Sequence, residues 1–250
     1  MRILISNDDG ASSPGIRRLA DAARLLSQDV WIVAPARKWT AASHQLTFDA
    51  EIVLERVGPK SYTCSGAPAD CIIAALAIVL RDAAMPALVL SGINDKRNVA
   101  EDLAYSGTMA VAREATFWGI PAIALSSDAP STSDPAQTRA LADVLQALWN
   151  GRLSWAVPGH WLSLNLPASL PAFLRQATIG HDKIGSACDV VSESPARTVY
   201  RNRRGRPGGS GADDENAVLR GGSIAMVRHT WCSTAPLPED TVAAFNPGGG

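Results

Sequence analysis

Short apolar runs alternate with amphipathic stretches along the first two thirds of the chain, and this rhythm restricts the possible folds more than any other feature. The runs have the length of buried strands and lie at 2–6, 29–34, 87–90, 121–125 and 161–166. The spacing predicts helices over 15–27, 69–82, 108–118 and 135–150, and β structure within 48–64. Strands separated by helices form a mostly parallel sheet covered on both faces. The sequence therefore predicts an α/β fold with three layers.

The rhythm ends near residue 170. We predict a core over 1–170, followed by a β-rich extension and tail over 171–250 that packs on the core and has a role in oligomerisation. The polar segment Arg201–Asp214 carries four arginines, which favour a solvated hairpin tip or, alternatively, a patch that attracts phosphate-rich ligands. The terminal Asn-Pro-Gly-Gly-Gly is expected to be disordered.

Composition excludes several classes of partner. A hydrophobic share of 46% supports a large core, and a net charge of −1 gives no general attraction to a nucleic-acid duplex or a membrane surface. The longest apolar stretch, Cys71–Leu80, is shorter than the roughly 20 residues of a membrane span. The four cysteines lack Cys-x-x-Cys spacing and no signal-peptide pattern is present, so we expect reduced thiols and a cytoplasmic protein.

The first apolar run leads directly into Asn7-Asp8-Asp9-Gly10. Two carboxylates at the end of a buried strand repel each other and lose hydration, and a bound hard cation such as Mg²⁺, Mn²⁺ or Ca²⁺ would offset both penalties. Alternatively, Asp8 and Asp9 cap the following helix and lie in solvent. This motif alone leaves both interpretations open.

Other polar clusters also follow predicted strands. Arg37, Thr40 and Ser43 come after the second strand, and Ser91-Gly92-Ile93-Asn94 comes after the next core strand, with Asn98 and Asp102 in the same loop. Ligands of open α/β sheets bind beyond the carboxyl ends of the strands. Carboxylate, amide and hydroxyl oxygens from three such loops favour the cation interpretation.

Tyr105-Ser106-Gly107-Thr108 precedes the helix predicted at 108–118. Free N–H groups at a helix start form an anion site, although Ser106 or Thr108 could instead be an ordinary N-cap. A cation next to an anion cradle is how a phosphate ester is held. The four histidines include no His-x-x-x-His or His-x-His spacing, which argues against zinc, and His44 is expected to be a solvated loop residue.

These motifs together resemble the SurE survival-protein family of 5′/3′-nucleotidases. The resemblance covers roughly the first two thirds of the chain and rests on residues 7–10, Ser13-Pro14-Gly15, Val33-Ala34-Pro35, Gly66-Ala67-Pro68-Ala69-Asp70-Cys71, residues 91–94, residues 105–108 and Asn165-Leu166-Pro167. It implies a Rossmann-like fold with a C-terminal β-hairpin extension, assembled as a homodimer or homotetramer. It also implies hydrolysis of nucleoside 5′- or 3′-monophosphates and, in some members, short polyphosphate.

The resemblance also implies roles for individual residues. One divalent ion per subunit, Mg²⁺ or Mn²⁺, would be held by Asp8, Asp9, Thr40 and Asn94, while Asn98, Ser106, Gly107 and Thr108 would bind phosphate. The expected catalytic residues are Asp8, Asp9, Asn94 and Ser106. A metal-activated water would attack phosphorus.

Four positions differ from the family pattern: Thr40 stands where serine is usual, and Ala41, Lys96 and Ala100 stand where glycine is usual. If the glycines replaced by Lys96 and Ala100 adopt positive φ, these two side chains must strain or reshape their loop. This leaves a catalytically weak nucleotide-binding or sensing protein as the alternative. A dinucleotide enzyme fits poorly, because the first strand lacks Gly-x-Gly-x-x-Gly and ends in carboxylates.

Overall fold

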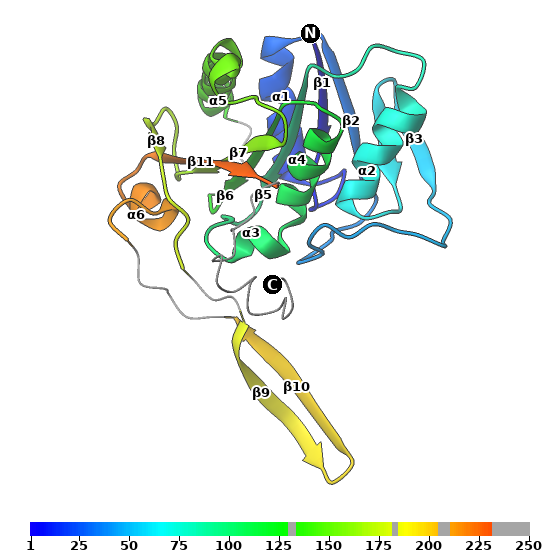
Figure 1. The fold of residues 1–250 in the computed structure, drawn as a ribbon, viewed down its shortest axis with the longest axis vertical. Helices are drawn as coiled ribbons and strands as arrows, with labels where there is room; N and C mark the ends of the chain where they lie inside the picture. Colours follow the sequence, from blue (N-terminus) through cyan, green and yellow to red (C-terminus); the bar gives the residue numbers. More distant parts are fainter. Residues whose placement is uncertain (130–133, 182–184, 205–210, 232–250) are drawn as a thin grey trace, which may run out of the picture.

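A nine-stranded sheet forms the centre of the molecule (Figure 1). The computed structural model describes residues 1–129, 134–181, 185–204 and 211–231. The strand order is β3-β4-β2-β1-β5-β6-β7-β11-β8. The strands are β1 (Arg2–Ser6), β2 (Asp29–Pro35), β3 (Leu54–Gly58), β4 (Ser61–Cys64), β5 (Leu88–Asn94), β6 (Ala122–Ser127), β7 (His160–Leu166), β8 (Leu174–Gln176) and β11 (Ile224–Thr230). Pairing is parallel from β4 through β2, β1, β5 and β6 to β7, as the alternating sequence predicts.

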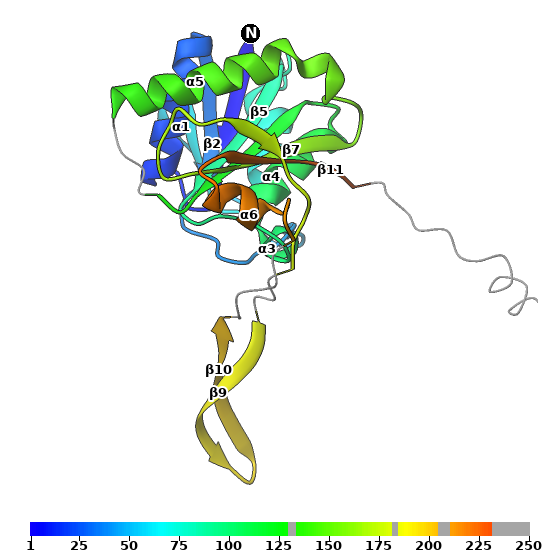
Figure 2. The same cartoon turned by 90° about the vertical axis from the view of Figure 1, so that its left-hand side faces the viewer.

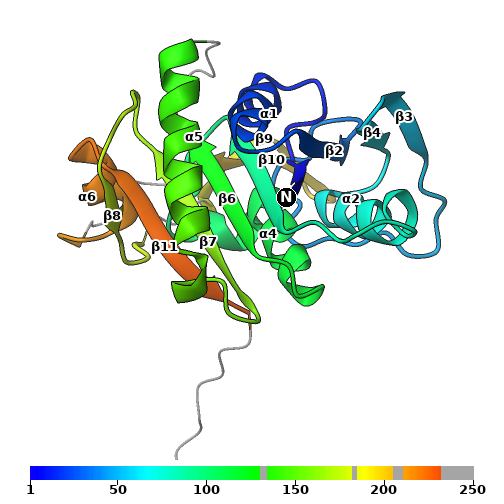
Figure 3. The ribbon, with the colours of Figure 1, turned by 90° about the horizontal axis from the view of Figure 1, so that it is seen from above.

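Helices cover both faces of this sheet, as Figure 3 shows from above. On one face, α1 (Pro14–Leu26) and α5 (Pro135–Asn150) pack over Ile3, Ile5 and Leu90. On the other face, α2 (Pro68–Ala74) and α4 (Gly107–Phe117) pack over Leu4 and Val89 in a cluster that also buries Cys64 and Cys71. Alternate residues of β1 thus enter opposite cores, as a strand buried on both faces requires. The predicted three-layer α/β fold is confirmed.

Two elements differ from the sequence-based boundaries. The helix predicted over 69–82 is α2 followed by a π-helical turn, Ala75–Val79. The strand predicted over 87–90 continues to Asn94, because Ser91, Gly92 and Ile93 are buried and stay in the sheet. The short helices α3 (Asp102–Tyr105) and α6 (Glu215–Arg220) and the 3₁₀ turn Arg152–Ser154 were not predicted.

The segment after residue 170 contributes strands to two separate sheets. Strands β8 and β11 join the edge of the main sheet, where β11 pairs antiparallel with β7 and parallel with β8. Strands β9 (Gly185–Ser194) and β10 (Arg197–Arg204) instead form a separate antiparallel hairpin that projects away from the core (Figures 1 and 2). The terminal Asn-Pro-Gly-Gly-Gly and the fourth arginine of the basic cluster, Arg206, lie outside the described residues.

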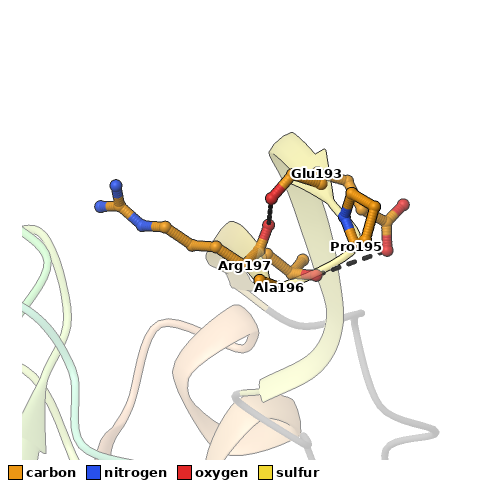
Figure 4. A pocket seen from close by; sticks show the side chains of 6 residues that line it. Glu193, Pro195, Ala196 and Arg197 are labelled. Carbon is orange, nitrogen blue, oxygen red and sulfur yellow. Dashed lines mark hydrogen bonds between the residues drawn. The ribbon is translucent and has the colours of Figure 1, made fainter.

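The remaining arginines of that cluster lie on β10 and not at the hairpin tip. The tip is formed by Glu193–Thr198, where Ser194 Oγ donates to the Arg197 carbonyl over 3.2 Å (Figure 4). A hollow of about 640 Å³ at the tip is lined by these six consecutive residues alone. Arg203 is paired with Asp189 on β9, with Nε 3.2 Å from Oδ2. The tip interpretation is therefore wrong for the arginines that the structure places.

None of the helices in the described part of the chain has the length and apolar character needed to cross a bilayer.

Candidate active site

Three neighbouring strands bring the predicted metal ligands to one edge of the sheet. Strand β1 lies between β2 and β5, parallel to both, so the loops that follow the three strands meet. The loop after β2 donates from Trp39 N to the Asp8 carbonyl over 2.7 Å. The loop after β5 donates from Asp95 N to Asp9 Oδ2 over 3.0 Å. Asp8, Asp9 and Thr40 therefore lie on loops, and Asn94 at the end of β5, in a region that hydrogen bonds between the three loops hold together.

Asn7 shapes the turn that carries the two carboxylates. It is fully buried, and its Nδ2 donates to the Gly10 carbonyl over 3.0 Å and to Ser13 Oγ over 2.8 Å. Gly10 has φ +97°, a conformation that residues with a side chain rarely adopt. Ser13 is the N-cap of α1, where its Oγ accepts from Ile16 N. Asp8 and Asp9 therefore do not cap α1, and that interpretation is wrong.

Asp8 is buried against the start of α4. Thr108 Oγ1 donates to Asp8 Oδ1 over 2.6 Å, and a Cβ added to Gly107 would lie 2.7 Å from Asp8 Cβ. Only glycine fits there. Burial raises the pKa of the Asp8 carboxyl to about 6, the Thr108 hydrogen bond opposes this shift, and the charge of Asp9 adds to it. The ionised carboxylate is thus destabilised in this environment.

The start of α4 supports both interpretations of its polar residues. Ser106 is the N-cap, since its Oγ accepts from Met109 N over 3.2 Å. Thr108 is not a cap, and its hydroxyl turns to Asp8. The N–H groups of Gly107 and Thr108 donate to no described acceptor and remain available at the positive end of the helix dipole.

Asn98 is held in a buried network beside these loops. It exchanges two hydrogen bonds with Asn165, of 2.9 and 2.8 Å, and its Nδ2 donates to Ser126 Oγ over 2.9 Å. Of the three positions where glycine is usual in the resembled family, Ala41 and Ala100 both have φ +54°, whereas Lys96 is not in the left-handed region. The strain of a positive φ is therefore present at the two alanines and not at Lys96.

Sequence reasoning did not find Lys38. Its ammonium lies 2.5 Å from Asp9 Oδ1 and 2.8 Å from Asp95 Oδ2. A cavity of about 470 Å³ opens beside it, within the usual range of small-molecule sites, roughly 300–1,000 Å³. Its lining residues include Asp9, Ser13, Lys38, Lys96 and Asp128. The only signal in the sequence is that Lys38 follows Arg37 in a loop already expected at the site.

The donor set at this edge fits a hard cation. Asp8 Oδ2 accepts no hydrogen bond from a described residue, and the Thr40 hydroxyl has no described partner. The Asn94 side chain donates to the Lys96 carbonyl over 2.6 Å, which leaves its Oδ1 free as an acceptor. Within the described ranges, no group of three or more His, Cys, Asp or Glu side chains gathers where it could hold a metal. A cation here would rely on two carboxylates with amide, hydroxyl and water oxygens, which suits Mg²⁺ or Mn²⁺ better than zinc.

Two other candidates lie away from this centre. His44 Nε2 is 2.9 Å from Glu114 Oε2 and its ring stacks on Phe117, so the prediction of a solvated loop histidine is wrong. Asp70 accepts from Thr47 N, Thr47 Oγ1 and Ala67 N, and so anchors the start of α2 and the loop before β3.

Comparison with known proteins agrees with these motifs. The model of the family described as "Survival protein SurE" matches residues 3–185. The chain belongs to the SurE family. The resemblance noted from the motifs is therefore confirmed.

Individual relatives extend the match beyond the core. The "5′-nucleotidase SurE" of Nitrobacter winogradskyi is 34% identical over 249 residues, covering 96% of this chain and 94% of the relative. The protein of the same name from Rhodopseudomonas palustris strain HaA2 is 48% identical over 128 residues, so this match spans only about half of each chain (51% and 50%). The crystal structure of the SurE protein from Aquifex aeolicus superposes with a TM-score of 0.75 at 26% identity, covering 98% of both chains.

Proposed function

We propose that this chain is a metal-dependent phosphomonoesterase that hydrolyses nucleoside 5′-monophosphates, and also 3′-monophosphates, to nucleoside and phosphate. The observation that carries the proposal is the buried Asp8 carboxylate, which lies against Gly107 and Thr108 at the start of a helix with free N–H groups. It joins a site for a cation to a site for an anion, and a phosphate ester bound with a cation needs both. The names of the relatives, 5′-nucleotidase SurE, support the same activity.

Each part of the site has a role in this proposal. Asp8, Asp9, Thr40 and Asn94 would hold one Mg²⁺ or Mn²⁺, which when bound would neutralise phosphoryl charge and lower the pKa of a water molecule. The N–H groups of Gly107 and Thr108, with Ser106 and Asn98 nearby in the sequence, would hold the phosphoryl oxygens as their charge shifts. Asp8 or Asp9 would orient the attacking water. The substrates extend to short polyphosphate, and the protein is expected to act in the cytoplasm.

The decisive experiment substitutes Asp8. Asp8→Asn should lower phosphate release from nucleoside monophosphates with Mn²⁺ or Mg²⁺ by about a hundredfold or more, because a preorganised charged group at the reacting centre is lost. The melting temperature should stay the same or rise, since a buried carboxylate at 7% exposure is replaced by a neutral isostere.

Asp21→Asn is the matched control, because Asp21 is an exposed carboxylate on α1 whose partner among the described residues is Arg24. Its activity should equal that of the wild type. Wild-type turnover in Asp8→Asn would contradict a role for this carboxylate. Tight nucleotide binding without phosphate release in the wild-type protein would favour the sensing alternative, which the sequence suggests through Lys96 and Ala100.

A further inference from the structure

The loop after β5 is held by side chains and not by regular backbone pairing. Four consecutive N–H groups each donate to a side-chain oxygen from a different part of the chain. The pairs are Arg97 with Asp128 (3.0 Å), Asn98 with Asn165 (2.9 Å), Val99 with Asp102 (3.4 Å) and Ala100 with Glu215 (3.3 Å). Asn98, Val99 and Ala100 are buried, and because a buried N–H must find an acceptor, their three acceptors constrain the path of the loop, while the Asp128 contact is at the surface.

Ala100 is the strained member of this loop. It is 2% exposed and has φ +54°, where an alanine carries a steric penalty that glycine avoids. A residue persists in such a conformation only when its surroundings hold it there. The Ala100 carbonyl accepts from Leu103 N, three residues along the chain, over 3.2 Å, so the acceptor of its N–H group, Glu215, is the contact from a distant part of the chain that keeps Ala100 left-handed.

Glu215 is an unusual residue for its location. It is fully buried at the start of α6, and its Oε2 also accepts from Gly180 N over 3.1 Å, while its Oε1 has no partner among the described residues. A buried carboxylate with one unpaired oxygen destabilises the fold unless its contacts compensate. Both of its hydrogen bonds go to backbone N–H groups of loops, one of which is the loop that carries Asn98.

We propose that Glu215 is a positioning residue, whose carboxylate holds Ala100 in the left-handed conformation and thereby fixes the main chain at Asn98. The inference rests on the proposed function, in which Asn98 contacts phosphate. It also gives the C-terminal segment a part in the site, because Glu215 lies 115 residues after Ala100.

A rescue experiment tests this role. Glu215→Ala should lower kcat/KM for a nucleoside monophosphate about tenfold or more and raise the inhibition constant of inorganic phosphate, since small displacements of binding groups cost up to roughly a hundredfold in rate. Adding Ala100→Gly to Glu215→Ala should restore most of kcat/KM and of the affinity for inorganic phosphate. Glycine adopts the left-handed conformation without the hydrogen bond from Ala100 N to Glu215. Glu215→Gln keeps an oxygen acceptor and should stay near wild type.

Asp214→Ala separates positioning from the stability of α6. Asp214 is the neighbouring buried carboxylate, and it caps α6 by accepting from Ala217 N over 2.8 Å without a hydrogen bond to Ala100. If Asp214→Ala lowers kcat/KM as much as Glu215→Ala, and Ala100→Gly rescues neither, the loss comes from α6 and the proposal is overturned.

Amide hydrogen exchange supplies a readout that needs no catalysis. Peptides covering residues 95–101 should exchange faster in Glu215→Ala than in the wild type. Unchanged exchange in an active protein would overturn the positioning role and leave the proposed function standing. If the wild-type protein releases no phosphate while Glu215→Ala still exchanges faster than the wild type, the proposed function is contradicted, and with it the role of Glu215 in that reaction.

Discussion

Lys38 places a protein cation where the proposed metal would bind. Its ammonium balances Asp9 and Asp95, so a divalent ion that uses Asp9 must displace it. We expect Lys38→Met to tighten Mn²⁺ binding about fivefold to tenfold, because a partly exposed ion pair contributes about 1 kcal/mol. Isothermal titration of protein stripped with a chelator measures the dissociation constant directly, without reference to turnover.

Lys60→Met is the control for this comparison. Lys60 also pairs with a carboxylate, Asp29, at 2.7 Å, and its side chain is 41% exposed against 47% for Lys38. Its removal should leave the Mn²⁺ dissociation constant unchanged. An equal constant in wild type and Lys38→Met would show that the ammonium does not compete with the ion.

Residues of the site differ in how far the sequence could predict them. Asp8 and Thr108 are 100 positions apart, yet both follow from a strand end and a helix start that a parallel sheet brings to one edge. Lys38 and Glu215 carry no such local signal. Their contacts with Asp9 and Ala100 depend on loop paths and on the docking of α6, which no periodicity encodes.

At the scale of elements, the antiparallel junction of β7 and β11 should make the fold sensitive to acid. His229 on β11 lies 2.7 Å from Ser163 Oγ on β7 and stacks on Trp161. Burial, helped by the charge of Arg113, lowers the pKa of His229 to about 4. The unfolded chain therefore binds a proton more readily between pH 6.5 and 4, so this stability is complete above pH 6.5 and is lost as the pH falls.

The expected size of this effect can be measured by urea unfolding. From pH 7.5 to pH 5 the wild type should lose about 2 kcal/mol through His229, a loss that His229→Gln lacks. Other groups titrate in both proteins, so their contributions to the free energy of unfolding cancel when the two pH dependences are subtracted. Parallel pH dependences in the two proteins would contradict a depressed pKa at this junction.

Elements with a strong hydrophobic periodicity in the sequence were predictable, and elements whose ends or existence depend on tertiary contacts were not. Helix α5 lies over the predicted residues 135–150, where Asp134 caps its start. Strand β5 runs past its predicted end because its polar residues are buried between β1 and β6. The three-residue strand β8 is too short to show a pattern, and it exists because β11 offers a neighbouring strand.

At the scale of the whole molecule, the hairpin β9–β10 is the part whose stability is least explained by packing within one subunit. Val190 and Tyr200 lie opposite each other on the two strands and are 60% and 57% exposed. An isolated two-stranded hairpin is at best marginally stable in water, and exposed apolar side chains on it indicate an association surface. The sequence predicts this excursion from the failure of the α/β rhythm, but the projection of the hairpin away from the sheet is a property of the folded chain (Figure 2).

The hairpin should therefore mediate the homodimer or homotetramer that the family resemblance implies. Replacing both side chains, Val190→Lys with Tyr200→Lys, should shift the protein to a monomer in sedimentation velocity, because lysine charges cannot be buried unpaired between subunits. Far-ultraviolet circular dichroism should stay unchanged, since neither residue contributes to the main sheet. Ser192→Lys, an exposed polar position on β9, adds a charge without removing apolar surface and should keep the wild-type assembly. A wild-type protein that sediments as a monomer, or a double variant that sediments like the wild type, would place any association elsewhere on the molecule.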